Sequence, residues 1–369
     1  MKSRVLLLIG LVVMLFSWPA LGAAGPLQAN FQTDPGLGEV PLDVHFSNTS
    51  SGGEEPLSYS WDFGDGEAPS NDQSPTHLYQ TPGPFEVKLT VTDKTGQTGV
   101  KSDSITVDGP TLVAALLPVS RSVVVSKPAT AFVTVINAGH ITAPAVRLKL
   151  DPTTGPGGTP LPAELMFQAT DPSTNLVTGA PNALLDIAAG KSQSYLIAVT
   201  PTAPLPPTDV RFVIGGANTT RSARKVSGLN TLLLSASTEA TPDIIAIAVT
   251  PDGNGILVLP GTSGTSAFAV ATANVGVAGA IRVSADTGAA ALPVGIVLCQ
   301  TDPVSGQCTS ASESSVTTQI GPGATPTFAV FVTAAGAVPY DPELRRVFVR
   351  FTDAGGATRG ATSVAVKTP

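Results

Sequence analysis

The segment Ser58–Gly66, with the sequence SYSWDFGDG, contains the residue types that could build a reactive or ligand-binding site. It places two carboxylates, Asp62 and Asp65, beside two glycines and a group of aromatic residues. Carboxylates serve as calcium ligands and as acid–base groups, and glycine-rich turns hold phosphates. Four interpretations therefore compete: a metal loop, a phosphate-binding loop, a catalytic corner and a structural turn.

The spacing within this segment argues against the first two interpretations. Gly64 and Gly66 stand without the third glycine, the lysine and the following helix of a phosphate-binding loop. Asp62 and Asp65 are three positions apart, whereas an EF-hand loop begins with oxygen ligands at alternating positions. We therefore expect no cofactor and no metal site, and calcium, with no ligand residues assigned, is the remaining alternative.

Catalytic motifs are missing from the sequence. The three histidines, His45, His77 and His140, lie outside any serine-hydrolase or zinc-protease motif. Acidic residues stand mostly in turns or at polar positions of strands, as in Glu54-Glu55, which favours a solvated surface over the paired carboxylates of a glycosidase. We expect a protein that is not an enzyme, with no catalytic residue. The alternative is an enzyme with an unrecognised site in the duplicated half described below.

The same segment is explained economically as a core strand followed by a turn. Alternation places Tyr59, Trp61 and Phe63 on one side of the strand, and the glycines allow the chain to reverse. We expect the Trp61 ring to pack between two sheets and the aspartates to accept hydrogen bonds from turn amides. The predicted structural motif consists of Trp61, Asp62, Phe63, Gly64, Asp65 and Gly66.

Period-two alternation extends through the surrounding segment, 26–108. In Pro84–Asp93, PFEVKLTVTD, apolar and polar residues alternate, and Pro41–Ser47, PLDVHFS, repeats the pattern. Turn formers such as Pro82-Gly83 separate these runs. About seven short strands in a segment of this length predict a two-sheet antiparallel sandwich.

Three stretches of this segment carry a family resemblance. VPLDVHFSNTS, SYSWDFGDG and SPTHLYQTPGPFEVKLTVTDKTG follow one another with the order and spacing of a PKD domain, and the last includes the His77-x-Tyr79 pair. The PKD domain is an immunoglobulin-like module first named from the polycystic kidney disease protein, and the resemblance covers about residues 29–107. It implies an extracellular β-sandwich that contacts proteins or polysaccharides, often beside another functional domain.

The remainder of the chain contains an internal duplication. Thr170–Thr178, TDPSTNLVT, parallels Thr301–Thr309, TDPVSGQCT, and Thr130–Gly139, TAFVTVINAG, parallels Ser266–Gly276, SAFAVATANVG. We name the two predicted copies repeat A, 110–237, and repeat B, 242–367. Both alternate like strands and loosely resemble the immunoglobulin-like repeats of bacterial surface proteins, without indicating a particular family. The predicted fold is all-β, with three tandem immunoglobulin-like antiparallel β-sandwich domains after a signal peptide.

The two cysteines, Cys299 and Cys308, both fall in repeat B, in CQTDPVSGQC. Turn formers between them would bring two strand ends together, and export favours oxidation of cysteines. We therefore predict a disulfide between Cys299 and Cys308. A metal site is disfavoured because no histidine or third cysteine lies nearby, and the spacing is wider than that of a redox C-x-x-C pair. Repeat A has Gln168 and Val177 at the aligned positions, so we expect local stabilisation and no shared function.

The first residues predict export. Lys2 and Arg4 precede an apolar run, Val5–Trp18, and small residues follow, which is typical of a cleaved signal peptide at 1–23. A retained anchor is the alternative, although it needs about 18 to 20 apolar residues. Later segments are too often interrupted to span a bilayer, so we expect no stable membrane span in the mature protein. The predicted location is extracytoplasmic: secreted, cell surface or periplasmic.

Charge and aromatic content narrow the choice of partner. The formal net charge is -7, and no basic cluster with interleaved aromatics appears, so we expect no nucleic-acid binding. We expect an exported binding, adhesion or structural protein whose PKD and immunoglobulin-like domains contact an envelope or extracellular protein or glycan. The alternative is an accessory polysaccharide- or protein-binding component of a secreted degradative system. That role predicts rows of exposed aromatics, yet Trp61 is the one tryptophan beyond the predicted signal peptide.

Overall fold

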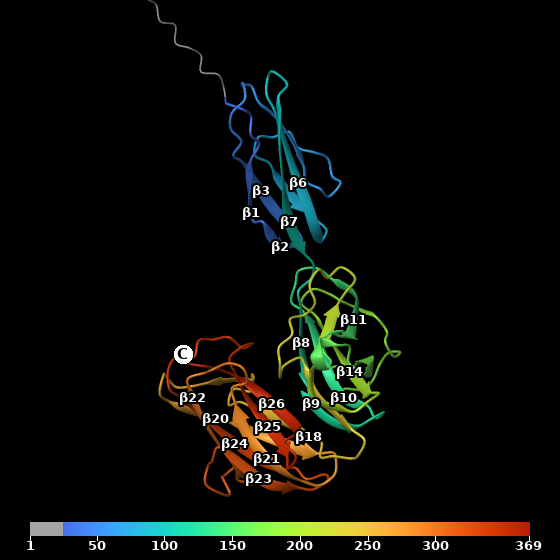
Figure 1. Cartoon of the computed structure of the whole chain (residues 1–369), viewed down its shortest axis with the longest axis vertical. Helices are drawn as coiled ribbons and strands as arrows, with labels where there is room; N and C mark the ends of the chain where they lie inside the picture. Colours follow the sequence, from blue (N-terminus) through green and yellow to red (C-terminus); the bar gives the residue numbers. More distant parts are fainter. Residues whose placement is uncertain (1–24) are drawn as a thin grey trace, which may run out of the picture. The chain divides into compact units, whose positions relative to one another are not determined.

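The computed structural model describes residues 25–369, and its regular elements are almost all β-strands (Figure 1). A short 3-10 turn at Pro156–Gly158 is the exception within these residues. The predicted signal peptide, 1–23, lies outside the described residues. No helix in the described part of the chain is long and apolar enough to cross a membrane.

The chain divides into two compact units. The first consists mainly of residues up to 105, and the second contains residues 106–369 together with the short segments 37–42 and 80–83. The first unit includes most of the predicted PKD domain, and the second includes both predicted repeats.

The PKD segment is a sandwich of a three-stranded and a four-stranded sheet. The first sheet has the order β1-β3-β5, with β1 (Phe31–Asp34), β3 (Leu42–Asn48) and β5 (Thr76–Tyr79). The second has the order β2-β7-β6-β4, with β2 (Leu37–Glu39), β7 (Thr98–Asp108), β6 (Gly83–Thr92) and β4 (Ser58–Asp62). Alternate residues of β3 and β6 are buried, as the sequence pattern predicts.

Both repeats contain a four-stranded sheet with matching strand order. In repeat A the order is β12-β14-β10-β8, with β12 (Ala163–Thr170), β14 (Ser192–Pro201), β10 (Ala129–Asn137) and β8 (Leu112–Leu117). In repeat B it is β22-β24-β20-β18, with β22 (Val294–Thr301), β24 (Thr327–Ala334), β20 (Thr265–Asn274) and β18 (Ile244–Val249).

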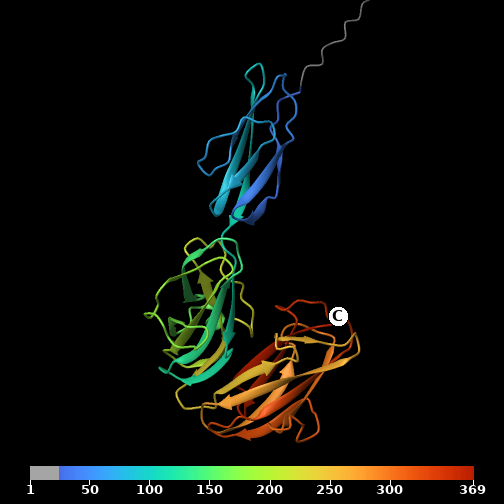
Figure 2. The same ribbon diagram turned by 180° about the vertical axis from the view of Figure 1, so that it is seen from behind.

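The opposite layers of the two repeats also match in strand order. Figure 2 shows the whole ribbon turned by 180°. Repeat B has one sheet, β23-β21-β25-β26-β19, with β23 (Ser315–Ile320), β21 (Gly279–Asp286), β25 (Arg346–Asp353), β26 (Thr358–Lys367) and β19 (Ile256–Val258). Repeat A has two smaller sheets, β13-β11-β16 and β15-β17-β9, with β13 (Leu185–Ile187), β11 (Ala143–Leu150), β16 (Phe212–Gly215), β15 (Leu205–Val210), β17 (Leu232–Ser237) and β9 (Ser120–Val124). The strands β15 and β16 together take the position of β25.

Each sandwich has one parallel strand pair within its otherwise antiparallel sheets. The pairs are β2 with β7, β9 with β17 and β19 with β26. In each case the preceding strand, β1, β8 or β18, pairs in the opposite sheet. The entering chain thus switches sheets, a detail that side-chain alternation alone does not reveal.

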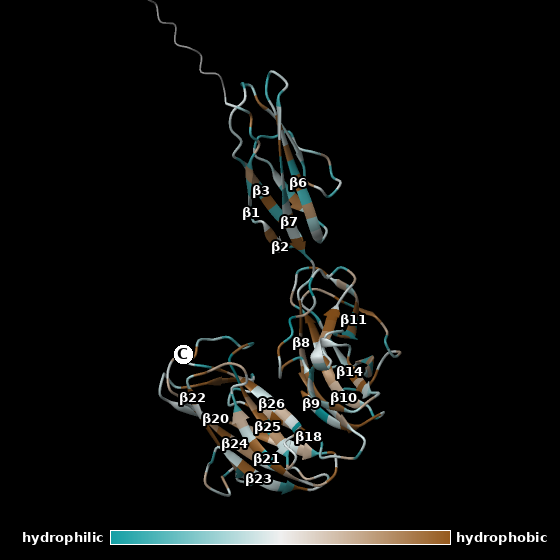
Figure 3. Ribbon diagram, in the orientation of Figure 1, coloured by the Kyte–Doolittle hydropathy of each residue, from teal (hydrophilic) through white to brown (hydrophobic). Residues whose placement is uncertain are grey.

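Separate hydrophobic cores fill the two repeats. One is formed by buried residues between Leu112 and Ala236, and the other by buried residues between Ile244 and Val366. Brown, apolar positions recur along the strands of both (Figure 3). The cores fall within the predicted ranges 110–237 and 242–367, whose ends stay predictions.

A buried asparagine ends the same strand in both repeats. Asn137 ends β10 and Asn274 ends β20, and both are fully buried. Their Nδ2 atoms donate to the carbonyl oxygens of Ile187 and Ile320, over 2.9 and 3.1 Å, and their Oδ1 atoms accept from the N–H two residues further on. These matched contacts make Asn137 and Asn274 equivalent positions.

This equivalence shifts the alignment of the two segments by one residue. If the two segments are aligned from their first residues, Thr130 and Ser266, then Phe132 aligns with Phe268. If they are aligned on the two asparagines, Phe132 aligns with Ala269. A shift of one residue reverses the face on which a side chain lies. Phe268 is accordingly 3% exposed, in the core, and Phe132 is 37% exposed, on the outer face.

The TDP loops of the two repeats have the same backbone hydrogen bonds. Thr170 bridges to Val177, and Thr301 bridges to Cys308. Asp171 and Asp302 each donate a backbone N–H to the residue five positions on, over 2.9 Å. In repeat B the loop also has the disulfide between Cys299 and Cys308, as the sequence predicts.

Replacing both Cys299 and Cys308 by serine is expected to lower the free energy of unfolding of repeat B by about 2 to 3 kcal/mol, because the bond closes a short loop. The loop conformation should persist, since repeat A forms it without a disulfide. Thermal and denaturant unfolding of the oxidised protein and the double variant provide the measurement, with Val177→Ser as the control in repeat A. Equal stability of the double variant and the oxidised protein would contradict the prediction.

Polar contacts at the junction of the two repeats are buried within the second unit. Arg121 of β9 contacts Asp243 through Nε and Nη2, over 3.0 and 2.9 Å. The other Asp243 oxygen accepts a hydrogen bond from the N–H of Ser122 over 2.8 Å. Ser120 Oγ accepts from the N–H of Ala361 in β26 over 2.7 Å. Strand β9 therefore bonds directly to repeat B.

Candidate binding site

Trp61 belongs to the core of the PKD segment. Its side chain is fully buried, and its ring centroid lies 5.1 and 5.4 Å from those of Phe31 and Phe46 in the opposite sheet. The indole Nε1 donates to the carbonyl oxygen of Asp72 over 2.9 Å. The ring packs between the two sheets, as the alternation predicts.

The two aspartates after Trp61 accept hydrogen bonds from the turn. Asp62 Oδ1 accepts from the N–H of Gly64 over 3.0 Å, and Asp65 Oδ1 accepts from the N–H of Glu67 over 3.1 Å. Gly64 has a φ of 79°, and a Cβ there would collide with the backbone of Glu86. Both oxygen atoms therefore organise the turn, as does the glycine between them.

A contact that no sequence motif predicts joins Asp65 to His77. The Asp65 Oδ2 and His77 Nε2 atoms lie 2.7 Å apart, and the imidazole stacks on Phe63 with centroids 3.9 Å apart. Burial by itself raises the pKa of Asp65, but the hydrogen bonds from His77 and the Glu67 amide outweigh it and hold that pKa below its usual value. Tyr79 donates its hydroxyl to the Phe63 carbonyl over 3.1 Å, and burial, followed by the charges of Asp65 and Asp62, raises its pKa.

Asp65, Glu67 and His77 also form a group with metal-ligand chemistry. One potential ligand atom from each lies within 4.8 Å of the others. The Asp65 and His77 atoms are already at hydrogen-bond distance from each other, and Glu67 is exposed, so a hydrogen bond between Asp65 and His77 that anchors the turn accounts for the group. The other histidines have different surroundings: His45 shares a hydrogen bond with Thr76, and His140 is exposed.

The strongest candidate for a binding surface is the outer face of the four-stranded sheet in repeat A. On this face Leu117 lies opposite Phe132, and Phe132 lies opposite Leu196. Val113 and Ile136 form a second directly opposed pair. We call these five residues the apolar face. The exposed fractions of Val113, Leu117, Phe132 and Ile136 are 44, 46, 37 and 42%.

The apolar face arises because β8 is apolar on both sides. Its sequence, LVAALL, buries alternate residues beginning with Leu112 and exposes the residues between them. Within the four strands of this sheet, Glu164 is the one charged residue among the outward positions. Contiguous exposed apolar residues mark interaction surfaces, whereas scattered ones do not. The doubly apolar LVAALL run is the sequence signal that could have indicated this face.

Repeat B has smaller side chains at the matching positions of β20. Counting from the equivalent asparagines, Phe132 corresponds to Ala269 and Ile136 to Ala273. Ala269 is exposed. The difference is confined to β20, because the outer face of repeat B carries Ile247 and Val249 on β18, Val297 on β22 and Phe331 on β24.

Comparison with protein families matches residues 27–107 to the PKD domain. Collagenase ColA of Clostridium perfringens is 46% identical over 70 residues, which are 18% of this chain and 6% of the collagenase. Pre-pro-metalloprotease PrtV of Vibrio cholerae is 41% identical over 70 residues, 19% of this chain and 8% of PrtV. The chain thus spans less than a tenth of the length of these relatives.

Among solved structures, the crystal structure of the PKD1 domain from the Vibrio cholerae metalloprotease PrtV is 36% identical in sequence. The match covers 22% of this chain and 98% of that domain, with a TM-score of 0.20.

Proposed function

From the premise that residues 27–107 form a PKD domain, we propose that this chain is an exported, non-catalytic binding protein that contacts another extracellular protein through the apolar face of repeat A. The PKD domain supports a binding or accessory role outside the cytoplasm. We choose this surface because two rows of apolar side chains cross its strands. One row consists of Leu117, Phe132 and Leu196, and the other of Val113 and Ile136.

The energetics favour covering this face. Complete burial of a large aliphatic or aromatic side chain contributes about 1.5 to 3 kcal/mol relative to exposure, and four such side chains here are more than one-third exposed. An interface core is apolar and depleted in charge, and the outward positions of this sheet carry Glu164 alone as a charge. The apolar face therefore has the composition of an interface core.

A protein partner fits this face better than a glycan does. Protein recognition of sugar rings commonly uses several exposed aromatic platforms, and the apolar face has a single aromatic residue, Phe132. The other large side chains are branched aliphatic residues, which pack well against another protein surface. An alternative role is that of an accessory component of a degradative system. It is supported by the similarity of about 70 residues to parts of a collagenase and a metalloprotease.

Phe132→Lys is expected to reduce capture of the partner by about tenfold or more, because it places a charge in the centre of an apolar contact. Ala269→Lys is the matched control, since it introduces the same charge at the equivalent exposed position of repeat B. The measurement is affinity capture from envelope and culture extracts with the mature protein, followed by binding of the purified partner. Thermal unfolding of both variants tests whether the fold is retained.

Equal capture by Phe132→Lys and the unmodified protein would remove the apolar face from the binding site. Retention on an insoluble polysaccharide, unaffected by Phe132→Lys, would favour the accessory role. Turnover in a hydrolase screen that depends on residues of the duplicated half would contradict a non-catalytic protein.

A further inference from the structure

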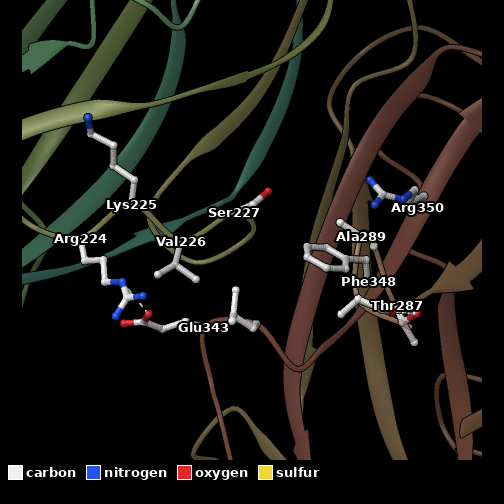
Figure 4. Close-up of a pocket in the computed structure, with 12 residues that line it drawn as sticks. Arg224, Lys225, Val226, Ser227, Thr287, Ala289, Glu343, Phe348 and Arg350 are labelled. Carbon is white, nitrogen blue, oxygen red and sulfur yellow. Dashed lines mark hydrogen bonds and ion pairs between the residues drawn. The ribbon is translucent and has the colours of Figure 1, made fainter. Parts of the chain in front are cut away.

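A pocket of about 560 Å³ opens within the second unit, where loops of repeat A and repeat B meet (Figure 4). Repeat A contributes residues 224–227. Repeat B contributes residues 287–290 and the side chains of Glu343, Leu344, Phe348 and Arg350. Binding pockets for small ligands commonly have volumes of roughly 300 to 1,000 Å³ and mostly apolar walls with a few polar groups. This pocket has that size and that mixture of residues.

Phe348 is held in place on the repeat B side of the pocket. Its ring lies between Gly228 of repeat A and Gly288 of repeat B, and a Cβ on either glycine would come within 2.8 Å of the ring. The Arg350 guanidinium carbon lies 5.1 Å from the ring centroid. Arg350 Nε and Nη2 donate to the Asp286 carboxylate over 2.6 and 3.2 Å, which leaves Nη1 to donate to a ligand. The aromatic ring and the guanidinium therefore form a preorganised pair.

The polar groups of the pocket are predominantly hydrogen-bond donors. Arg224 Nε lies 2.7 Å from Glu343 Oε2, so this pair joins the two repeats at the pocket edge (Figure 4). The Arg224 side chain is largely exposed and keeps its terminal nitrogens for further hydrogen bonds. Lys225 points away from the pocket in Figure 4 and binds Asp151 over 2.6 Å. Arg224, Arg350 and the Ser227 hydroxyl remain as donors around the pocket.

We propose that this pocket binds the C-terminal residue of a peptide whose last side chain is apolar. The terminal carboxylate is the acceptor that matches a donor-rich rim, and guanidinium groups bind carboxylates with charge-assisted hydrogen bonds. The apolar side chain of the peptide packs against Phe348, Leu344 and Val226. The Arg224 and Arg350 guanidinium groups are each held by a carboxylate, Glu343 and Asp286, and the nitrogens that these pairs leave over are the donors offered to the ligand. This site is separate from the apolar face and does not depend on the function proposed for it.

The test uses the mature protein and two fluorescent tripeptides, Gly-Gly-Leu with a free carboxylate and the same peptide as a C-terminal amide. The free acid is expected to bind saturably, and the amide about tenfold more weakly, because the amide removes the negative charge. Arg224→Gln should weaken binding of the acid by about five- to tenfold. Arg282→Gln, which removes an exposed charge from β21 outside the pocket, should change it by less than about twofold.

The proposal is supported if the free acid binds saturably, if the amide binds about tenfold more weakly, and if Arg224→Gln weakens binding of the acid much more than Arg282→Gln does. Equal binding of acid and amide, equal effects of Arg224→Gln and Arg282→Gln, or no saturable binding would overturn it. Glucuronate competing as well as the peptide would also overturn it, by assigning the pocket to acidic sugars. Phe132→Lys should leave peptide binding unchanged, so failure here is distinguishable from failure of the apolar face, and thermal unfolding of Arg224→Gln confirms that the variant folds.

Discussion

Trp61→Ala is expected to destabilise the PKD domain by about 3 to 5 kcal/mol, because it empties the fully buried space between the two sheets. The substitution also removes the donor for the Asp72 carbonyl oxygen and the contacts with Phe31 and Phe46. Small domains are stable by only about 5 to 15 kcal/mol, so a large part of that stability is lost. Denaturant unfolding of an isolated segment 26–108, followed by circular dichroism, gives the measurement once the unmodified segment is shown to fold.

Trp61→Phe is the control for this experiment. It keeps an aromatic ring in the core and should cost less than alanine does, since a smaller cavity remains. If Trp61→Ala retained its unfolding transition but lost a ligand, the segment Trp61–Gly66 would have to be treated as a binding site and not as a structural motif.

Asp243→Ala is expected to destabilise the second unit by about 3 to 5 kcal/mol, because it leaves the guanidinium of Arg121 buried without its partner. The exposed fractions of the two side chains are 5% for Asp243 and 12% for Arg121. Burial raises the pKa of Asp243 even though Arg121 opposes this shift, so desolvation of the carboxylate is substantial. The unfolding midpoint should fall, and limited proteolysis should cleave faster near residues 238–243.

The double substitution Arg121→Met with Asp243→Leu tests whether the unpaired buried charge, and not the loss of packing at the junction, causes the destabilisation. Apolar residues of similar volume often replace a buried ion pair without loss of stability, so the double variant should recover much of what Asp243→Ala loses. An unchanged midpoint in Asp243→Ala would show that the Arg121 contact contributes little to the joint between the repeats.

The sequence was sufficient for features that depend on neighbours along the chain. Alternation correctly placed Trp61 in the core, and turn chemistry predicted the hydrogen bonds of Asp62 and Asp65. The short separation of Cys299 and Cys308 predicted their bond. In each case the relevant contacts lie within a few residues or follow from the two-residue period of a strand.

Other features depend on packing between distant segments. The hydrogen bond between Asp65 and His77 forms only when β5 lies beside the turn after β4, and no spacing rule specifies that contact. The outward position of Phe132 depends on a one-residue difference in register from repeat B, which the shared residues AF conceal. The pocket beside Phe348 is formed by loops from both repeats.

The parallel edge pair of each sandwich has a mechanical consequence. In β2 with β7, β9 with β17 and β19 with β26, a strand from the beginning of a domain runs alongside the strand that ends it. Tension applied to the two ends of such a domain slides these strands past each other, so several backbone hydrogen bonds must break together. Antiparallel end strands would instead separate one bond at a time. If the chain is held at both ends, each of the three sandwiches therefore resists tension through its parallel strand pair, which is the mechanically stronger of the two arrangements.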